Sequence, residues 1–158
     1  MGDAPELNKV SSLNNIRLID FGFAIKYKDV PNTLQKIFKG NIVFASKHLF
    51  NLQTPSRRDD LISLGYVMLY MIDGDLPFIK DESISIFNPR QDQEQDFKRV
   101  KTLKNILTPA DLCRTREGKL ILPYLREVYS LEYEETPNYD KLAFLLVKSL
   151  LDLNMVPT

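Results

Sequence analysis

The feature that most restricts the fold is a long, nearly uncharged run, LISLGYVMLYMIDG, which follows four charged residues and covers residues 61–74. Placed on a helix of 3.6 residues per turn, its apolar side chains occur on every side. A helix that is apolar all round is normally buried, so this one is predicted to be the central element of a helical domain. Thr54, Pro55 and Ser56 form a start signal, and Gly74 is a suitable C-cap.

The rest of the chain also reads as mainly helical. A short helix is expected over 46–52 with Ser46 as its cap, and longer helices are expected over 96–107, 119–131 and 138–154. Alternating residues at 15–20 and 23–27 suggest a hairpin across Gly22. Residues 80–95 are polar and are expected to form a loop. The predicted fold class is therefore mainly α, with one small β-hairpin near the N-terminus.

Composition excludes several classes of protein. The 158 residues suffice for one domain, and 21 basic residues balance 21 acidic ones, so no broad basic surface for nucleic acid or an anionic membrane is expected. One histidine and one cysteine cannot make a zinc site of those ligands, and Cys113 is expected to be a buried or half-buried thiol. No signal peptide and no apolar run long enough to cross a membrane is visible, so the expected location is cytoplasmic or nuclear.

Asp20, Phe21 and Gly22 follow the first predicted strand. A carboxylate there could bind Mg²⁺ that bridges phosphate oxygens, while glycine lets the backbone turn and the aromatic ring packs under the site. The same three residues also occur in ordinary turns, and on their own they favour that simpler interpretation.

Two further groups of polar residues have simple explanations when taken alone. The charged residues at 57–60 read as a solvated helix start, with carboxylates near the positive end of the helix dipole. His48 reads as a helix-surface residue rather than as a catalytic base.

Taken together, four motifs in order resemble the casein kinase I family of protein kinases. The motifs are DFGFAIKY from Asp20, KGNIVFAS from Lys39, PSRRDDLISLGYVMLYMIDGDLPF from Pro55, and YEETPNYDKLAFLL from Tyr133. The resemblance extends from about residue 16 to about residue 151. It divides the chain into a polar segment at 1–15, a partial kinase domain (the C-terminal lobe) at 16–154, and a tail at 155–158.

The resemblance implies ATP-dependent phosphorylation of serine or threonine in proteins, with ATP and Mg²⁺ as cofactors of the parent family. In an intact parent, Asp20 would be the Mg²⁺ ligand, and Phe21 and Gly22 would shape the loop that holds the nucleotide and metal. The residues that would hold the protein substrate are Gly40, Asn41, Ala45 and Ser46. The motif Asp60, Ser63, Gly65 would be structural support, with a buried Asp60 accepting hydrogen bonds from the catalytic loop.

Two positions depart from the family pattern. Asn41 replaces a threonine whose hydroxyl bonds the catalytic residues in the family, and an amide is not an equal substitute. Val43 replaces an arginine that helps bind acidic or phosphorylated substrates, which weakens any expected preference for such substrates.

The sequence also lacks parts that phosphoryl transfer needs. The 158 residues contain no Gly-x-Gly-x-x-Gly lid, no matching ATP lysine and no Arg-Asp catalytic loop, so no catalytic residue is assigned. Met1 and Gly2 match the end of the family's catalytic loop, which suggests a fragment, an internal start or a truncated gene. We expect a chain that is inactive alone and holds ATP and Mg²⁺ at most weakly.

The alternative is a non-catalytic scaffold that uses the surface of a kinase C-lobe to bind another protein. An unrelated helical domain is a third option, which four ordered motifs disfavour. The expected partners are a protein substrate or a protein partner, without nucleic acid or membrane. Because the family's neighbouring helix has no counterpart in the sequence, one side of the helix at 57–74 should stay uncovered and could support self-association.

Overall fold

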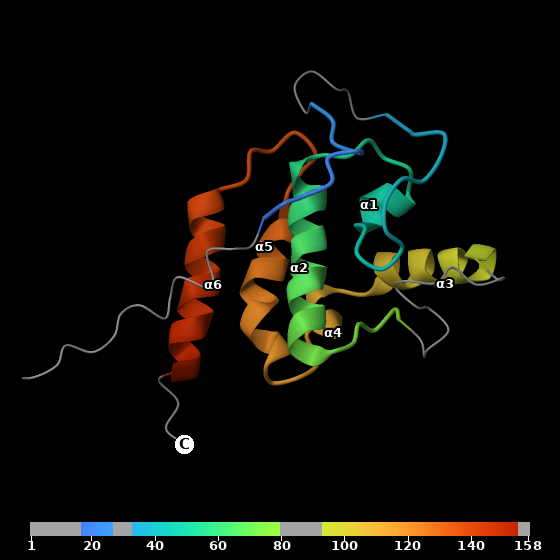
Figure 1. Ribbon diagram of the computed structural model, residues 1–158. Helices are drawn as coiled ribbons and strands as arrows, with labels where there is room; N and C mark the ends of the chain where they lie inside the picture. The colour runs from blue at the N-terminus through green and yellow to red at the C-terminus, as the bar shows by residue number, and fades with distance from the viewer. Residues whose placement is uncertain (1–16, 27–32, 80–92, 155–158) are drawn as a thin grey trace, which may run out of the picture.

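The computed structural model describes residues 17–26, 33–79 and 93–154, which form a helical body (Figure 1). Helix α5 packs against the long helix α2, α6 lies on the far side of α5, α4 packs against α5, and α1 contacts α3. The elements are α1 (Lys47–Phe50), α2 (Arg57–Asp73), α3 (Gln93–Ile106), α4 (Pro109–Leu112), the 3-10 turn η2 (Gly118–Ile121), α5 (Leu122–Ser130) and α6 (Tyr139–Asn154). The mainly α fold class is confirmed.

Helix α2 forms where the sequence predicts it and ends as expected. At its start, the Ser56 backbone N–H donates to the Asp59 carboxylate at 2.8 Å, which satisfies one of the free amides of the first turn. At its end, Gly74 takes the left-handed conformation with φ 73°, which a residue without a Cβ adopts at no steric cost. Ile62, Tyr66 and Leu69 are fully buried, so the helix is the central element of the core.

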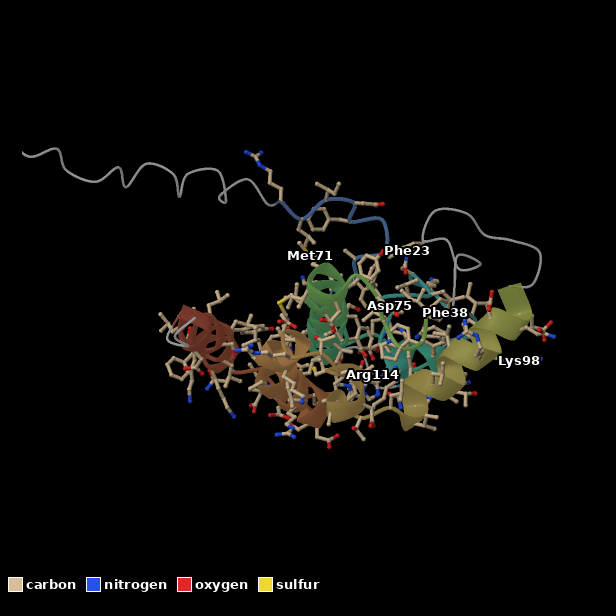
Figure 2. All side chains as sticks on the ribbon, turned by 90° about the horizontal axis from the view of Figure 1, so that it is seen from below. Phe23, Phe38, Met71, Asp75, Lys98 and Arg114 are labelled. Atoms are coloured by element: carbon tan, nitrogen blue, oxygen red, sulfur yellow. The ribbon has the colours of Figure 1, made fainter. Side chains whose placement is uncertain are left out.

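The opposite side of α2 is not covered by the described part of the chain. Leu64, Met71 and Ile72 are exposed there, with 78% of the Met71 surface open to solvent. Figure 2 shows Met71 and Phe23 on the same side of the molecule, where segment 17–26 runs. The expected uncovered apolar side of this helix is therefore present among the described residues.

Helices α2 and α5 approach each other closely at Gly65. A Cβ at this position would lie only 2.5 Å from Leu125 Cδ2, so no larger residue fits without a shift. Two hydroxyl contacts strengthen the same interface: Tyr124 donates to the Leu61 carbonyl at 2.9 Å, and the hydroxyls of Tyr66 and Tyr129 lie 2.5 Å apart.

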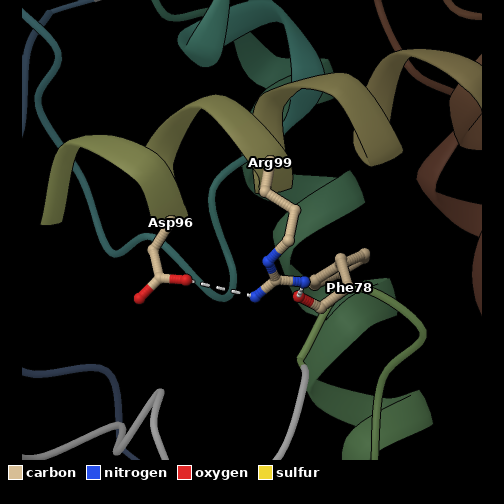
Figure 3. A network of polar contacts seen from close by, with 3 residues as sticks. All are labelled: Phe78, Asp96 and Arg99. Carbon is tan, nitrogen blue, oxygen red and sulfur yellow. Dashed lines mark hydrogen bonds and ion pairs between the residues drawn. The ribbon is translucent and has the colours of Figure 1, made fainter. Parts of the chain in front are cut away.

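The other helices agree with the sequence, with small differences at their ends. The helix expected over 119–131 begins as the 3-10 turn η2 and becomes α5, with Pro123 in its first turn, where a missing N–H costs little. The short helix α4 was not predicted; its cap is Thr108, whose hydroxyl accepts the Asp111 N–H. In α3, Arg99 donates to the Phe78 carbonyl at 3.1 Å and pairs with Asp96 (Figure 3), which fixes the turn that follows α2.

The predicted hairpin does not form within residues 17–26. Residues 17–26 contain no strand, and the remaining residues of the expected pair lie outside the described part. A turn forms at Gly22 and Phe23, but a strand needs a paired neighbour, and none of the described residues provides one there. Among the described residues the only β pairing is an isolated antiparallel bridge between Leu34 and Gln53.

Candidate functional site

The predicted metal-binding segment, residues 17–26, runs beside the N-terminal half of α2 (Figures 1 and 2). Its apolar side chains are largely exposed, including Leu18, Phe21 and Phe23. Its hydrogen bonds within the described residues are local: Gly22 N–H donates to Asp20 Oδ1 at 3.2 Å, and Ala24 N–H donates to the Phe21 carbonyl at 3.0 Å. The segment is thus shaped by its own turn rather than by packing.

Asp20 presents its carboxylate at the bend of this turn. Its backbone has φ 60°, a left-handed value that is uncommon for a residue other than glycine but tolerated by aspartate. A hard oxygen ligand of this kind suits Mg²⁺, which is usually held by one or two carboxylates together with substrate phosphates. No cluster of three His, Cys, Asp or Glu side chains suited to a metal occurs in the part that the structure describes. Asp20 therefore fits Mg²⁺ as a single protein ligand, and phosphate oxygens would have to complete the coordination of the ion.

The predicted peptide-binding residues lie in a compact turn between Gly40 and Ser46, here called the peptide segment. Gly40 has φ 143°, and a Cβ there would meet the Ala45 methyl at 3.4 Å. The Asn41 side-chain oxygen accepts the Val43 N–H at 2.8 Å and the Phe44 N–H at 3.1 Å, and its carbonyl accepts the Ala45 N–H at 2.8 Å. The amide that replaces the family's threonine thus stabilises its own turn.

The end of the peptide segment is joined to α2 by a buried polar contact. The Ser46 hydroxyl donates to the Asp59 carboxylate, whose second oxygen accepts the Ser56 N–H. Asp59 is only 1% exposed, so its charge is stabilised by these donors and by the positive end of the helix. Ser46 also caps α1 by accepting the Leu49 N–H at 3.4 Å, which confirms its predicted capping role.

Lys104 of α3 holds the middle of the peptide segment. Its ammonium nitrogen lies 2.7 Å from the Val43 carbonyl and 2.5 Å from the Ala45 carbonyl. The side chain is 1% exposed, and the same nitrogen lies over three aromatic rings, those of Phe50, Tyr66 and Phe78, at 5.0, 4.6 and 4.3 Å from their centroids. Burial lowers the pKa of Lys104 to about 6, while the carbonyl oxygens and ring faces favour its charged form.

Sequence reasoning missed Lys104 because it stands in a lysine-rich helix that reads as solvated. A signal was nevertheless present: positions 97, 100, 104 and 107 follow the 3-4-3 spacing of a buried helix face. The other three positions hold Phe97, Val100 and Leu107, so a lysine in this row is a candidate for a buried amine.

The structural support motif lies on α2 as predicted, but the expected burial of Asp60 is wrong. Asp60 is exposed, and no described residue donates a hydrogen bond to its carboxylate; its neighbour Asp59 is the buried one. Partial desolvation, and then the charge of Asp59, raise the pKa of Asp60. Gly65 is buried against α5, whereas Ser63 is partly buried, and the catalytic support role of these residues remains a prediction.

Two other polar predictions are also corrected. The charged start of α2 is not simply solvated, because Arg58 is buried and donates to the Leu131 carbonyl and to the Gln53 side chain, both at 3.1 Å. His48 is partly buried in α1 rather than on the surface, and burial, followed by the charge of Arg58, lowers its pKa. Cys113 is 1% exposed, as expected, and burial raises the pKa of its thiol to about 11.

The structure therefore arranges the predicted site residues in two groups. Asp20, Phe21 and Gly22 share the exposed turn, while Gly40, Asn41, Ala45 and Ser46 share the anchored peptide segment. None of the helices in the described ranges is long and apolar enough to pass through a membrane.

Comparison with known proteins supplies relatives, although no family model matches the chain. The chain is 32% identical over 146 residues to casein kinase I homolog 2 of Saccharomyces cerevisiae, and 33% identical over 146 residues to casein kinase I homolog 1 of the same yeast. It is 31% identical over 149 residues to casein kinase I homolog 3 of Schizosaccharomyces pombe. Each match covers 89% of this chain but only 25%, 26% and 32% of the respective relative, so the chain spans about a quarter to a third of their length.

Proposed function

We propose that this chain, which is similar to one segment of casein kinase I homologs, belongs to that family and is the C-lobe portion of a Ser/Thr protein kinase. In this proposal it contributes the substrate-facing half of a phosphotransfer site. The observation that carries it is the anchored peptide segment, whose turn is built by Asn41 and joined to the helices through Ser46 and Lys104. Such an anchored turn suits the positioning of a peptide near a phosphate donor.

Asp20 is the residue that would hold Mg²⁺ in the complete site, and bound Mg²⁺·ATP would supply the phosphoryl group and neutralise its charge. The exposed carboxylate of Asp20 can receive such a group without displacing a packed neighbour. Phe21 and Gly22 would set the bend that presents it. The protein substrate would lie along residues 40–46, where Val43 in place of the family's arginine gives no cation for an acidic side chain.

We further propose that these 158 residues do not transfer phosphate on their own. The test is incorporation of labelled phosphate into dephosphorylated casein or into the chain itself, with Asp20→Ala as the matched variant. We expect no incorporation above background from either protein. Turnover that survives purification and is lost in Asp20→Ala would contradict the proposal.

Nucleotide binding provides a separate test. Calorimetry with ATP and Mg²⁺ should give no heat of specific binding with the 158-residue chain. A longer protein, in which a kinase N-lobe and catalytic loop are fused before residue 16, should bind and should lose Mg²⁺-dependent affinity when Asp20 is replaced by alanine. Tight binding by the short chain would show that the site needs no further part.

The exposed apolar residues favour a second candidate function, that of a protein-interaction module. Leu64, Met71 and Ile72 on α2 and Phe23 on the same side of the molecule are open to solvent, and exposed apolar residues grouped on one side commonly mark a protein interface. Under this alternative, the chain should form oligomers or a complex whose mass by light scattering falls when Met71 is replaced by serine. A monomer at all concentrations, with or without the change, would argue for the kinase portion alone.

A further inference from the structure

The burial of the Lys104 amine is not explained by core packing alone. It is buried among three aromatic rings, and no carboxylate among the described residues contacts it. An amine without a counter-charge is costly to bury, and an apolar side chain of similar volume would fill the same space more favourably. What Lys104 adds is two N–H donors, and both are used.

Both acceptors belong to the peptide segment. The carbonyls of Val43 and Ala45 flank Phe44, whose ring packs edge-on against Tyr70 of α2 at 5.9 Å. Asn41 satisfies N–H groups of the same turn, while Lys104 satisfies carbonyl groups, so donors and acceptors of this short stretch are bonded from two sides.

The contact is also long-range. Lys104 lies 61 residues from Val43 and 59 from Ala45 along the chain, so it couples the position of α3 to the shape of the segment. Arg99, five residues earlier in α3, donates to the Phe78 carbonyl, and the Phe78 ring is one of the three that surround Lys104. Helix α3 thus holds two loops through basic side chains that donate to backbone carbonyls.

We propose that Lys104 is a positioning residue, which fixes the backbone of residues 43–45 in the conformation that presents a peptide substrate. This inference rests on the proposed function for its substrate, but the positioning itself can be measured without any ligand. It predicts that removing the donors loosens the segment and leaves the helices unchanged.

The experiment compares hydrogen–deuterium exchange in the full chain for wild type, Lys104→Met and Lys98→Met. Methionine is unbranched and only slightly shorter than lysine but donates no hydrogen bond. Lys98 is an exposed lysine of the same helix whose ion pair with Glu94 contributes little. We expect amides 43–46 to exchange about tenfold faster in Lys104→Met, with no change in α2 or α5, and wild-type rates throughout in Lys98→Met. Equal acceleration of all helices, unfolding of Lys104→Met, or no acceleration of 43–46 would each overturn the proposal.

A second measurement separates this inference from the proposed function. Dephosphorylated casein is titrated against wild type and Lys104→Met, each carried in the longer protein with a kinase N-lobe. A loss of about tenfold in affinity, together with faster local exchange, supports both proposals. If exchange is faster in Lys104→Met but neither protein binds casein, the proposed substrate is overturned and the positioning role is supported. If exchange is unchanged and casein binds normally, the positioning role is overturned and the proposed substrate is supported.

Discussion

The two segments that carry the predicted kinase chemistry differ in how firmly the fold holds them. Residues 17–26 form a local turn with exposed side chains, and their hydrogen bonds within the described residues join near neighbours in the sequence. The peptide segment is held by buried contacts from two distant helices, through Asp59 of α2 and Lys104 of α3. The helical body therefore anchors residues 40–46 through distant side chains, whereas residues 17–26 have only local hydrogen bonds among the described residues.

This difference predicts that the two segments differ in local stability. Local unfolding free energies are lowest where few apolar contacts are buried and highest in the packed core. The peptide segment shares the stability of the core because its anchors are core residues. The predicted metal-binding turn has only local hydrogen bonds among the described residues, so its local unfolding free energy should be lower.

The largest effect should come from breaking the anchor in α2. Replacing Asp59 by alanine leaves the Ser46 hydroxyl and the Ser56 N–H without their buried acceptor, which should reduce the free energy of unfolding by about 2–4 kcal/mol. Urea unfolding followed by circular dichroism measures this change. The matched control is Asp60→Ala, an adjacent but exposed carboxylate, which should cost less than about 1 kcal/mol. Equal losses in the two variants would mean that the peptide segment is not anchored as described.

The second largest effect is expected at the close contact between α2 and α5. Gly65→Ala forces a methyl group into Leu125 of α5, and overpacking of this kind should lower the free energy of unfolding by about 1–3 kcal/mol. Leu64→Ala, at the exposed neighbouring position, should cost less than about 1 kcal/mol. A neutral Gly65→Ala would show that α2 and α5 are less closely packed than the structure has them.

A pH titration sharpens the comparison at Lys104. The pKa of its amine is 10.5 without burial and about 6 in the folded chain, so between these values the unfolded state binds more protons. The free energy of unfolding of wild type relative to Lys104→Met should therefore rise with pH above about 6, by at most about 1.4 kcal/mol per pH unit. Urea titrations from about pH 6 to about pH 9 measure it. A flat difference would mean that the rings and carbonyls keep the ammonium charged.

The smallest effect is expected in the metal-binding turn. Asp20→Ala removes the acceptor of the Gly22 N–H in an exposed segment that can relax, so the free energy of unfolding should change by less than about 0.5 kcal/mol. Asp20→Asn, which keeps a side-chain acceptor, should behave like wild type. A loss comparable to that of Asp59→Ala would overturn the contrast between the two segments.

Sequence patterns predicted the elements in which the spacing of apolar residues indicates which side is buried. Helix α2 and its glycine cap follow from apolar residues on all sides and from local turn chemistry, which act without distant partners. The hairpin could not be settled in this way, because pairing depends on a neighbour that alternation alone does not identify. Asp59 and Asp60 are adjacent and chemically alike, and only the direction in which the core lies decides which of them is buried.

The peptide segment illustrates the same limit. Its boundaries were predicted from its resemblance to a family motif, and Ser46 was expected to cap a helix, which the structure confirms. Its anchor could not be predicted with equal ease, because Lys104 is distant in sequence and lysine is normally a surface residue. Only the helical spacing of Lys104 within a row of apolar residues indicated that its side chain is buried.

The burial of Cys113 gives the molecule a chemical reporter of its own. The sequence has a single cysteine, whose thiol is enclosed in the core with a pKa of about 11, so neither its exposure nor its charge favours reaction in the native state. Alkylation by iodoacetamide should proceed only during transient opening of the body near α4. Its rate would follow the breathing of that region in unmodified protein, without an added label.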